Sequence, residues 1–266
     1  MAGEKMGPGI DYEAAKGVAW LTINQPAKMN AMTFDMWSAL PGLIARAEND
    51  AEVRVIVLTG AGDRAFCAGA DISQFGEKRT GEDAVKAYEQ AVGAGMDAVA
   101  DARKPVVARI RGVAFGGGLA LALCCDLRIG SADSRFRIPA ARLGLGYAFA
   151  NVEALVHRIG LGPTSDLLLS ARIVDGAEAE RLGLVNKTWP GETFDASARD
   201  YIAAIASNAP LTLAALKKSL VETAKAHSER DRAGADALVA ACFRSEDYKE
   251  GQAAFKEKRV PNFKGK

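Results

Sequence analysis

Short apolar runs alternate with segments of helical periodicity along the chain up to about Leu161. The apolar runs predict strands at residues 18–23, 53–59, 106–110 and 127–129. Helical spacing predicts a helix that begins after the N-cap residue Thr33, and further helices at residues 84–102 and 119–124. Because strands alternate with helices, the pattern favours a partly parallel sheet with right-handed crossovers.

Beyond Leu161 the pattern changes, and one helical segment follows another. Helices are predicted at residues 163–170, 177–182, 194–206 and 211–226. Only residues 185–188 look extended in this part of the sequence. We therefore expect an α/β protein with a core at residues 1–190 and a helical region at residues 191–266.

The composition is that of an ordinary globular protein, with 49% hydrophobic and 25% charged residues in a chain of 266. A net charge of +1 gives no support for binding to nucleic acid or to an anionic membrane. Four cysteines without metal-ligand spacing are typical of free thiols in a reducing compartment. We recognise no signal or transit peptide and no apolar run of the roughly 18 residues that a membrane span needs, so we expect a cytoplasmic protein.

Three segments rich in small residues follow predicted strands, at residues 65–72, 112–120 and 136–147. The first (AFCAGADI) is expected to lead into a helix that begins near Asp71, and the second (GVAFGGGLA) places three glycines before a helix. Free N–H groups and the helix dipole favour an anion at such helix starts. The third (FRIPAARLGLGY) runs from a strand into a glycine-rich turn. Each segment alone is equally compatible with a simple turn.

Taken in order, the three segments resemble the crotonase (enoyl-CoA hydratase/isomerase) superfamily. The resemblance includes N-Q-P…N-A-M at residues 24–32, AEAERLGLV at residues 177–185 and SEDYKEGQAAFKEKRVPNF at residues 245–263. It implies a crotonase-like spiral of ββα turns with a C-terminal helical trimerisation region. It also implies assembly as a homotrimer or as a dimer of trimers.

The resemblance further implies an acyl-coenzyme A thioester as the ligand, with no separate cofactor and no metal. Two backbone N–H groups, which match those of Ala70 and Gly117, form an oxyanion hole for the thioester oxygen. An enolate carries its charge on that oxygen, so two preorganised donors stabilise it more than they stabilise the ground state. Lys28 and Lys258 are candidates for contacts with the phosphates of coenzyme A. The full set of expected coenzyme A contacts is Lys28, Ala31, Ala68, Gly69, Ala70, Asp71, Ile72, Phe255 and Lys258.

The chain departs from the hydratases of the family at the two positions of their catalytic glutamates. One position lies three residues after the middle glycine of the triplet and is Ala120 here. The other directly follows Pro139 and is Ala140. A general acid or base typically contributes ~10²–10⁴ in rate, so the loss of both disfavours hydration by that route. Isomerases that keep the second glutamate are disfavoured for the same reason.

Tyr147 is the polar group that remains near the third segment. Residues 139–147 (PAARLGLGY) resemble the P-x-N-L-G-V-P-Y segment of methylmalonyl-CoA decarboxylases of this superfamily. There a tyrosine orients the leaving carboxylate, and no acidic base is required because the loss of CO₂ itself produces the enolate. The match is partial, because those enzymes have a histidine at the position of Ala70.

Our leading hypothesis is an acyl-CoA lyase of the decarboxylase type, in which Tyr147 assists. A second hypothesis is a hydratase or isomerase that uses another acid, such as Glu153. A third is an acyl-CoA-binding protein that has lost catalysis. Incubation with crotonyl-CoA and, separately, with malonyl- and methylmalonyl-CoA distinguishes the three.

Overall fold

Two β-sheets lie at the centre of the part of the chain that the structure describes. The computed structural model describes residues 4–5, 9–74 and 81–266. The larger sheet contains, in spatial order, β1 (Glu4–Lys5), β2 (Ile10–Ala15), β3 (Val18–Ile23), β4 (Val55–Gly60), β6 (Val106–Ile110), β8 (Leu127–Ser131) and β11 (Lys187–Trp189). Its first three strands pair antiparallel, and the later neighbours pair parallel.

The smaller sheet and the helices complete a repeated ββα unit. This sheet contains, in spatial order, β10 (Val174–Asp175), β9 (Arg135–Arg137), β7 (Val113–Phe115) and β5 (Ala65–Cys67). Along the chain, a strand of the larger sheet is followed by a strand of the smaller sheet and then by a helix. The units are β4-β5 before α3 (Glu82–Ala100), β6-β7 before α4 (Gly117–Cys124) and β8-β9 before α5 (Ala140–Leu143). This succession confirms the expected α/β spiral.

Helices cover both faces of the larger sheet because its central strands have apolar side chains on both sides. The remaining helices are α1 (Phe34–Asn49), α6 (Phe149–Ile159), α7 (Leu161–Ser170), α8 (Gly176–Arg181), α9 (Phe194–Ala206), α10 (Pro210–Ala224), α11 (Arg232–Arg244) and α12 (Glu246–Glu257). On β4, Ile56 and Leu58 pack in the cluster that contains residues of α1 and α4, whereas Val55 and Val57 pack in the cluster of α9. The expectation of a doubly covered strand is therefore confirmed.

Most predicted elements are present, with shifts at their ends and one error. Thr33 is the N-cap of α1, and its hydroxyl accepts a hydrogen bond from the Met36 N–H at 3.2 Å. The prediction that an α-helix begins near Asp71 is wrong, because the chain forms a 3₁₀ turn there, η2 (Ile72–Gln74). Residues 75–80 lie outside the described part. The Asp71 carboxylate accepts hydrogen bonds from the N–H and hydroxyl of Ser73, and such local bonds compete with a regular helix.

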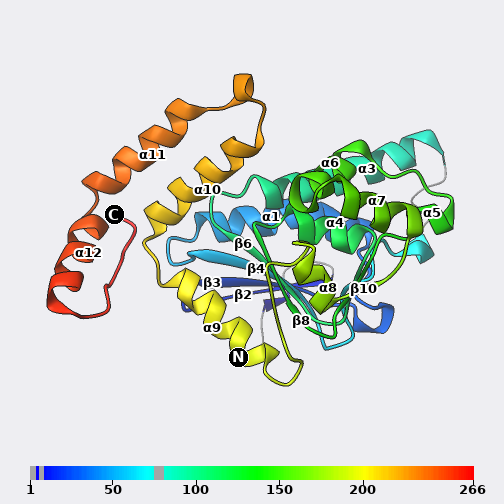
Figure 1. Ribbon diagram of the computed structural model, residues 1–266, viewed down its shortest axis with the longest axis horizontal. Helices are drawn as coiled ribbons and strands as arrows, with labels where there is room; N and C mark the ends of the chain where they lie inside the picture. The colour runs from blue at the N-terminus through cyan, green and yellow to red at the C-terminus, as the bar shows by residue number, and fades with distance from the viewer. Residues whose placement is uncertain (1–3, 6–8, 75–80) are drawn as a thin grey trace.

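The C-terminal helices α10, α11 and α12 extend away from the sheets at one end of the molecule (Figure 1). α9 packs instead on the larger sheet, where Phe194, Ala198 and Ile202 are buried. Within residues 4–5, 9–74 and 81–266, we find no helix of the length and apolar character that spanning a bilayer requires.

Candidate active site

The pairing of two short strands brings the first two small-residue segments together. β5 and β7 are parallel neighbours in the smaller sheet, with Ala65 opposite Val113 and Cys67 opposite Ala114. Parallel strands have their carboxyl ends at the same edge of a sheet, so residues 68–70 and 116–118 emerge side by side. Ligands bind preferentially at this edge in α/β proteins.

The backbone around Ala70 is fixed by hydrogen bonds that leave its own N–H free. The Met32 N–H donates to the Gly69 carbonyl at 2.7 Å, and the Asp71 N–H donates to the Met32 carbonyl at 2.9 Å. In this parallel bridge between Met32 and Ala70, the Ala70 N–H points away from the partner strand. No acceptor for it is present among the described residues. The donor is therefore held rigidly and is available to a ligand.

The glycine triplet begins α4 against β5. A Cβ atom on Gly118 would lie 2.2 Å from the carbonyl oxygen of Cys67, so only glycine permits this close approach. Gly116 has a φ of 50°, which glycine adopts without strain, and its N–H donates to the Arg137 carbonyl at 2.9 Å. Gly117 is the first residue of α4, where N–H groups have no acceptor within the helix.

The free N–H groups of Ala70 and Gly117 lie across a narrow gap. A Cβ atom built on Gly117 would lie 3.8 Å from the amide nitrogen of Ala70. A Cβ atom built on Gly69 would lie 3.4 Å from the amide nitrogen of Gly117. The two segments thus approach each other within van der Waals contact range, which places both amide nitrogens beside the same space. The partial positive charge at the start of α4 favours an anion here by about 0.3–1 kcal/mol.

A cavity of about 650 Å³ opens beside these two amides. This volume lies within the roughly 300–1,000 Å³ that is usual for small-molecule sites. Most of the lining is apolar, and it is contributed by α1, α3, the start of α4 and residues 138–147. All three small-residue segments of the sequence therefore meet at one cavity, with Ala68, Gly69, Ala70, Gly116, Gly117, Ala140 and Tyr147 among its lining residues.

The two alanines at the hydratase glutamate positions differ in their surroundings. Ala140 is the first residue of α5, is half-buried and lines the cavity. Ala120 is buried in α4, two residues after the glycine triplet. Neither position offers a carboxylate to a bound thioester.

Tyr147 lies at the same cavity, with its hydroxyl buried. This hydroxyl has no hydrogen-bond partner among the residues that the structure describes. Burial, together with the nearby Cys124 thiol, raises the pKa of Tyr147 well above its usual value. The phenol therefore remains a neutral hydrogen-bond donor at physiological pH.

Two glutamates bear on the question of an acid at this site. Glu153 lies on α6, is exposed and is not among the residues that line the cavity. Glu89 lies on α3 and does line it, although sequence motifs gave no reason to select it. Helical periodicity is the sequence feature that relates Glu89 to the cavity, because Val85, Tyr88 and Val92 share its helix face.

The expected coenzyme A residues near the N-terminus surround an ion pair. The Lys28 ammonium donates to the Asp71 carboxylate and to the Ser73 hydroxyl, each at 2.8 Å. Burial alone raises the pKa of Asp71, but the hydrogen bonds from Lys28 and Ser73 outweigh it and hold that pKa below its ordinary value. Lys28 is half-exposed, and its ammonium has one N–H group beyond the two that these bonds use. Ala31 is buried, and its carbonyl accepts from the Gln25 side chain at 2.9 Å.

Other expected contacts lie apart from the cavity. Phe255 lines a different groove, between the C-terminal helices, and Lys258 is the exposed C-cap residue of α12. Ile72 begins η2. Cys67 is buried beneath the loop, and burial raises its pKa to about 12, so this thiol is unsuited to nucleophilic chemistry. No group of three or more metal-ligating side chains is assembled within the described residues.

Comparisons with known proteins identify the family of the chain. The family model described as enoyl-CoA hydratase/isomerase matches residues 13–266. The short-chain-enoyl-CoA hydratase of Clostridium acetobutylicum is 34% identical, over 94% of this chain and 95% of that protein. The carnitinyl-CoA dehydratase of Proteus mirabilis is 35% identical, over 98% of this chain and 100% of that protein.

Solved structures give the same result for the fold. The crystal structure of an enoyl-CoA hydratase/carnithine racemase from Magnetospirillum magneticum has a TM-score of 0.90 and 31% identity, and the match covers 97% of this chain and 96% of that one. A match of this extent, like that of the family model, spans both sheets and the C-terminal helices. The chain therefore belongs to the enoyl-CoA hydratase/isomerase family.

Proposed function

We propose that this protein processes an acyl-CoA thioester as a lyase of the decarboxylase type, by stabilising a thioester enolate. The observation that carries the proposal is the pair of free N–H groups on Ala70 and Gly117 beside a cavity that Ala140 lines, in a chain with alanine at both hydratase glutamate positions. Decarboxylation tolerates this arrangement because no base is needed to generate the enolate.

The proposed step is the heterolysis of one carbon–carbon bond. The bond between the α-carbon and its carboxylate breaks, CO₂ leaves, and the electron pair forms the enolate. Negative charge develops on the thioester oxygen, which the two amides hold, and a proton is then added at the α-carbon. Donors that are already oriented stabilise this charge without reorganisation, and one such donor is typically worth ~10²–10³ in rate.

The experiment that tests the proposal compares three substrates. We expect CO₂ release from malonyl-CoA or methylmalonyl-CoA and little hydration of crotonyl-CoA. Efficient hydration of crotonyl-CoA without any decarboxylation would exclude the lyase. Binding of all three esters without turnover of any would instead favour an acyl-CoA-binding protein that lacks catalysis.

Tyr147→Phe is expected to lower kcat for decarboxylation on the order of tenfold, since one hydrogen bond contributes about 0.5–1.5 kcal/mol. Tyr147 lines the cavity, and its buried hydroxyl has no hydrogen-bond partner among the described residues, so we propose that it donates to the leaving carboxylate. Steady-state kinetics with malonyl-CoA measure the effect. Tyr201→Phe is the matched control. Tyr201 lies on α9, packs against Trp189 and does not line the cavity. Equal rates for the Tyr147→Phe variant and the wild type would leave the hydroxyl without a role.

Hydration or dehydration is the second candidate function, and the relatives favour it. The relatives from Clostridium acetobutylicum and Proteus mirabilis are named as a hydratase and a dehydratase. This reaction needs a group that transfers protons to and from water and the α-carbon. The alanines at positions 120 and 140 do not supply one, so another acid would have to act.

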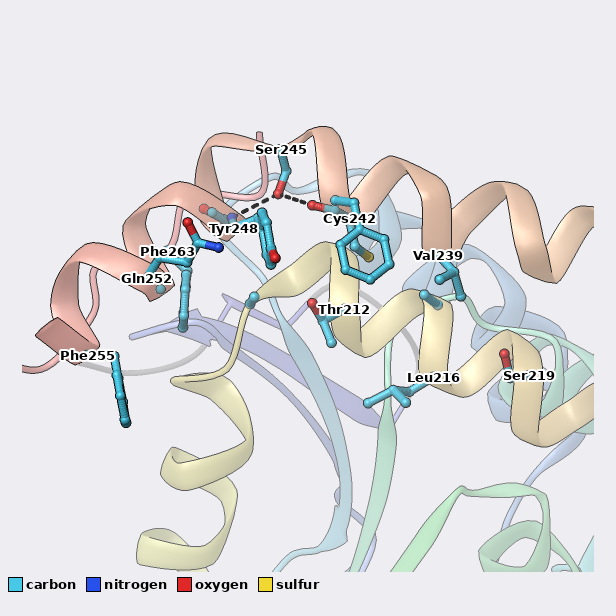
Figure 2. Close-up of a pocket in the computed structure, with 15 residues that line it drawn as sticks. Thr212, Leu216, Ser219, Val239, Cys242, Ser245, Tyr248, Gln252, Phe255 and Phe263 are labelled. Atoms are coloured by element: carbon cyan, nitrogen blue, oxygen red, sulfur yellow. Dashed lines mark hydrogen bonds between the residues drawn. The ribbon is translucent and has the colours of Figure 1, made fainter.

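We also propose that the protein assembles as a homotrimer or a dimer of trimers through its C-terminal helices. Figure 2 shows side chains of α10, α11 and α12 around an apolar groove, among them Leu216, Val239 and Phe255. Leu216 is 56% exposed, Phe243 is 62% exposed and Phe255 is 85% exposed. A second copy of the chain would remove this apolar surface from water.

Phe243→Asp is expected to convert the assembly into monomers, because a buried carboxylate without a partner is costly at an interface. Sedimentation velocity at micromolar concentration measures the change. Ala237→Asp places the same charge on an exposed position of α11 outside the groove and should leave the assembly intact. A wild-type protein that sediments as a monomer would contradict the proposal.

A further inference from the structure

One face of α3 lies along the cavity and carries a single charge. Val85, Tyr88, Glu89 and Val92 line the cavity at the spacing of one helical face. Glu89 is the one charged side chain among the cavity-lining residues that the structure describes. It makes no ion pair with any described residue, and it is exposed to solvent on its other side.

We propose that Glu89 transfers the proton at the α-carbon of the bound thioester, the task of the glutamates that this chain lacks. The inference rests on the proposed enolate chemistry, since it requires a thioester oxygen that the amides of Ala70 and Gly117 hold. It goes further by naming a proton-transferring residue on an element that carries none of the sequence motifs.

Three other acids of the described residues are excluded from this role by their contacts or by their place. Asp71 forms an ion pair with Lys28, at 2.8 Å. Asp126 accepts from the Val106 N–H at 2.7 Å and forms an ion pair with Lys217. Glu153 does not line the cavity. Among the residues that the structure describes, Glu89 alone combines a place on the cavity with access to solvent, which a group needs in order to exchange its proton between turnovers.

The proton-transfer step balances without a further reactant. The Glu89 carboxylate takes the proton of the α-carbon, and the electron pair of the broken C–H bond forms the enolate, whose charge lies on the thioester oxygen. The carboxyl group exchanges its proton with solvent and returns one to the α-carbon. In decarboxylation only the second half operates, and the carboxyl group protonates the enolate that the loss of CO₂ leaves.

The test is the exchange of α-protons in a saturated acyl-CoA, because this reaction isolates proton transfer from carbon–carbon bond cleavage. Propionyl-CoA is incubated with the full-length protein in D₂O, and deuterium at the α-carbon is followed by NMR. Glu89→Gln is expected to slow the exchange at least about 100-fold, the lower range for a general base. Glu89→Asp keeps a carboxylate and should restore part of the rate. Glu153→Gln is the matched control and should exchange within about twofold of the wild type.

Two results overturn the inference in different ways. Exchange that is lost in Gly117→Pro but retained in Glu89→Gln would remove Glu89 from the mechanism and leave the enolate function intact. The absence of exchange in the wild type, with propionyl-CoA bound, would overturn the enolate function and the role of Glu89 with it. Circular dichroism and propionyl-CoA affinity establish that each variant is folded and binds the ester.

Discussion

Gly117→Pro is expected to lower kcat/KM for acyl-CoA turnover by ~10²–10³ while the protein stays folded. Proline has no backbone N–H, so the substitution deletes one of the two proposed oxyanion donors. Its ring also occupies the space beside the amide nitrogen of Ala70, where the thioester oxygen is proposed to bind. No side-chain substitution acts on the proposed donors so directly.

The position tolerates proline for local reasons. Gly117 is the first residue of α4, where the missing N–H has no acceptor in the helix and the fixed φ of proline suits the turn. The preceding residue, Gly116, has no Cβ atom to clash with the proline ring. The expected loss is therefore a loss of catalysis rather than of the fold, and thermal unfolding checks this.

Glu82→Pro is the matched control for this substitution. Glu82 is also the first residue of a helix, α3, and also follows a glycine with positive φ, Gly81. It is exposed and does not line the cavity. Its variant should keep wild-type turnover. If Gly117→Pro also kept it, the Gly117 amide would have no part in the reaction.

Ala140→Glu is expected to raise crotonyl-CoA hydration at least about 10²-fold over the wild type, the usual contribution of a general acid or base. Ala140 lines the cavity and begins α5, where a carboxylate is favoured by the helix dipole. The substitution restores the carboxylate of the hydratases at that position. The loss of absorbance of the unsaturated thioester measures the rate.

Ala141→Glu is the control for Ala140→Glu. Ala141 is the next residue of α5, is exposed and does not line the cavity, so its variant should hydrate crotonyl-CoA no faster than the wild type. Equal gains in both variants would mean that added charge, rather than position, changes the rate. A wild-type protein that already hydrates crotonyl-CoA efficiently would show that the alanines do not limit this chemistry.

The long elements could be predicted from the sequence because their apolar patterns are strong. β3, β6 and α9 have the predicted bounds, since each has apolar runs or helical spacing that ends at polar or turn residues. The strands β5 and β7 have only three residues each, which is too few for periodicity to indicate a strand. Their pairing is the contact that joins the two small-residue segments, so the smaller sheet could not be derived from the pattern alone.

The site was predictable where backbone geometry requires particular residues. Gly118 has to be small because α4 approaches β5 closely there, and Gly69 and Gly116 have the positive φ that favours glycine. The glycines of the sequence therefore indicate where these requirements apply. Glu89 was not predictable, because its importance depends on which face of α3 meets the cavity. Helical spacing shows which residues share a face of α3, but only the fold shows which of its faces meets the cavity.

The central claim is that the amides of Ala70 and Gly117 hold one thioester oxygen. A crystal structure of the protein with acetoacetyl-CoA tests it most directly. We predict a thioester oxygen about 2.7–3.2 Å from both amide nitrogens, the range of N–H···O hydrogen bonds. A thioester that lies in the cavity with its oxygen in contact with neither amide would contradict the account.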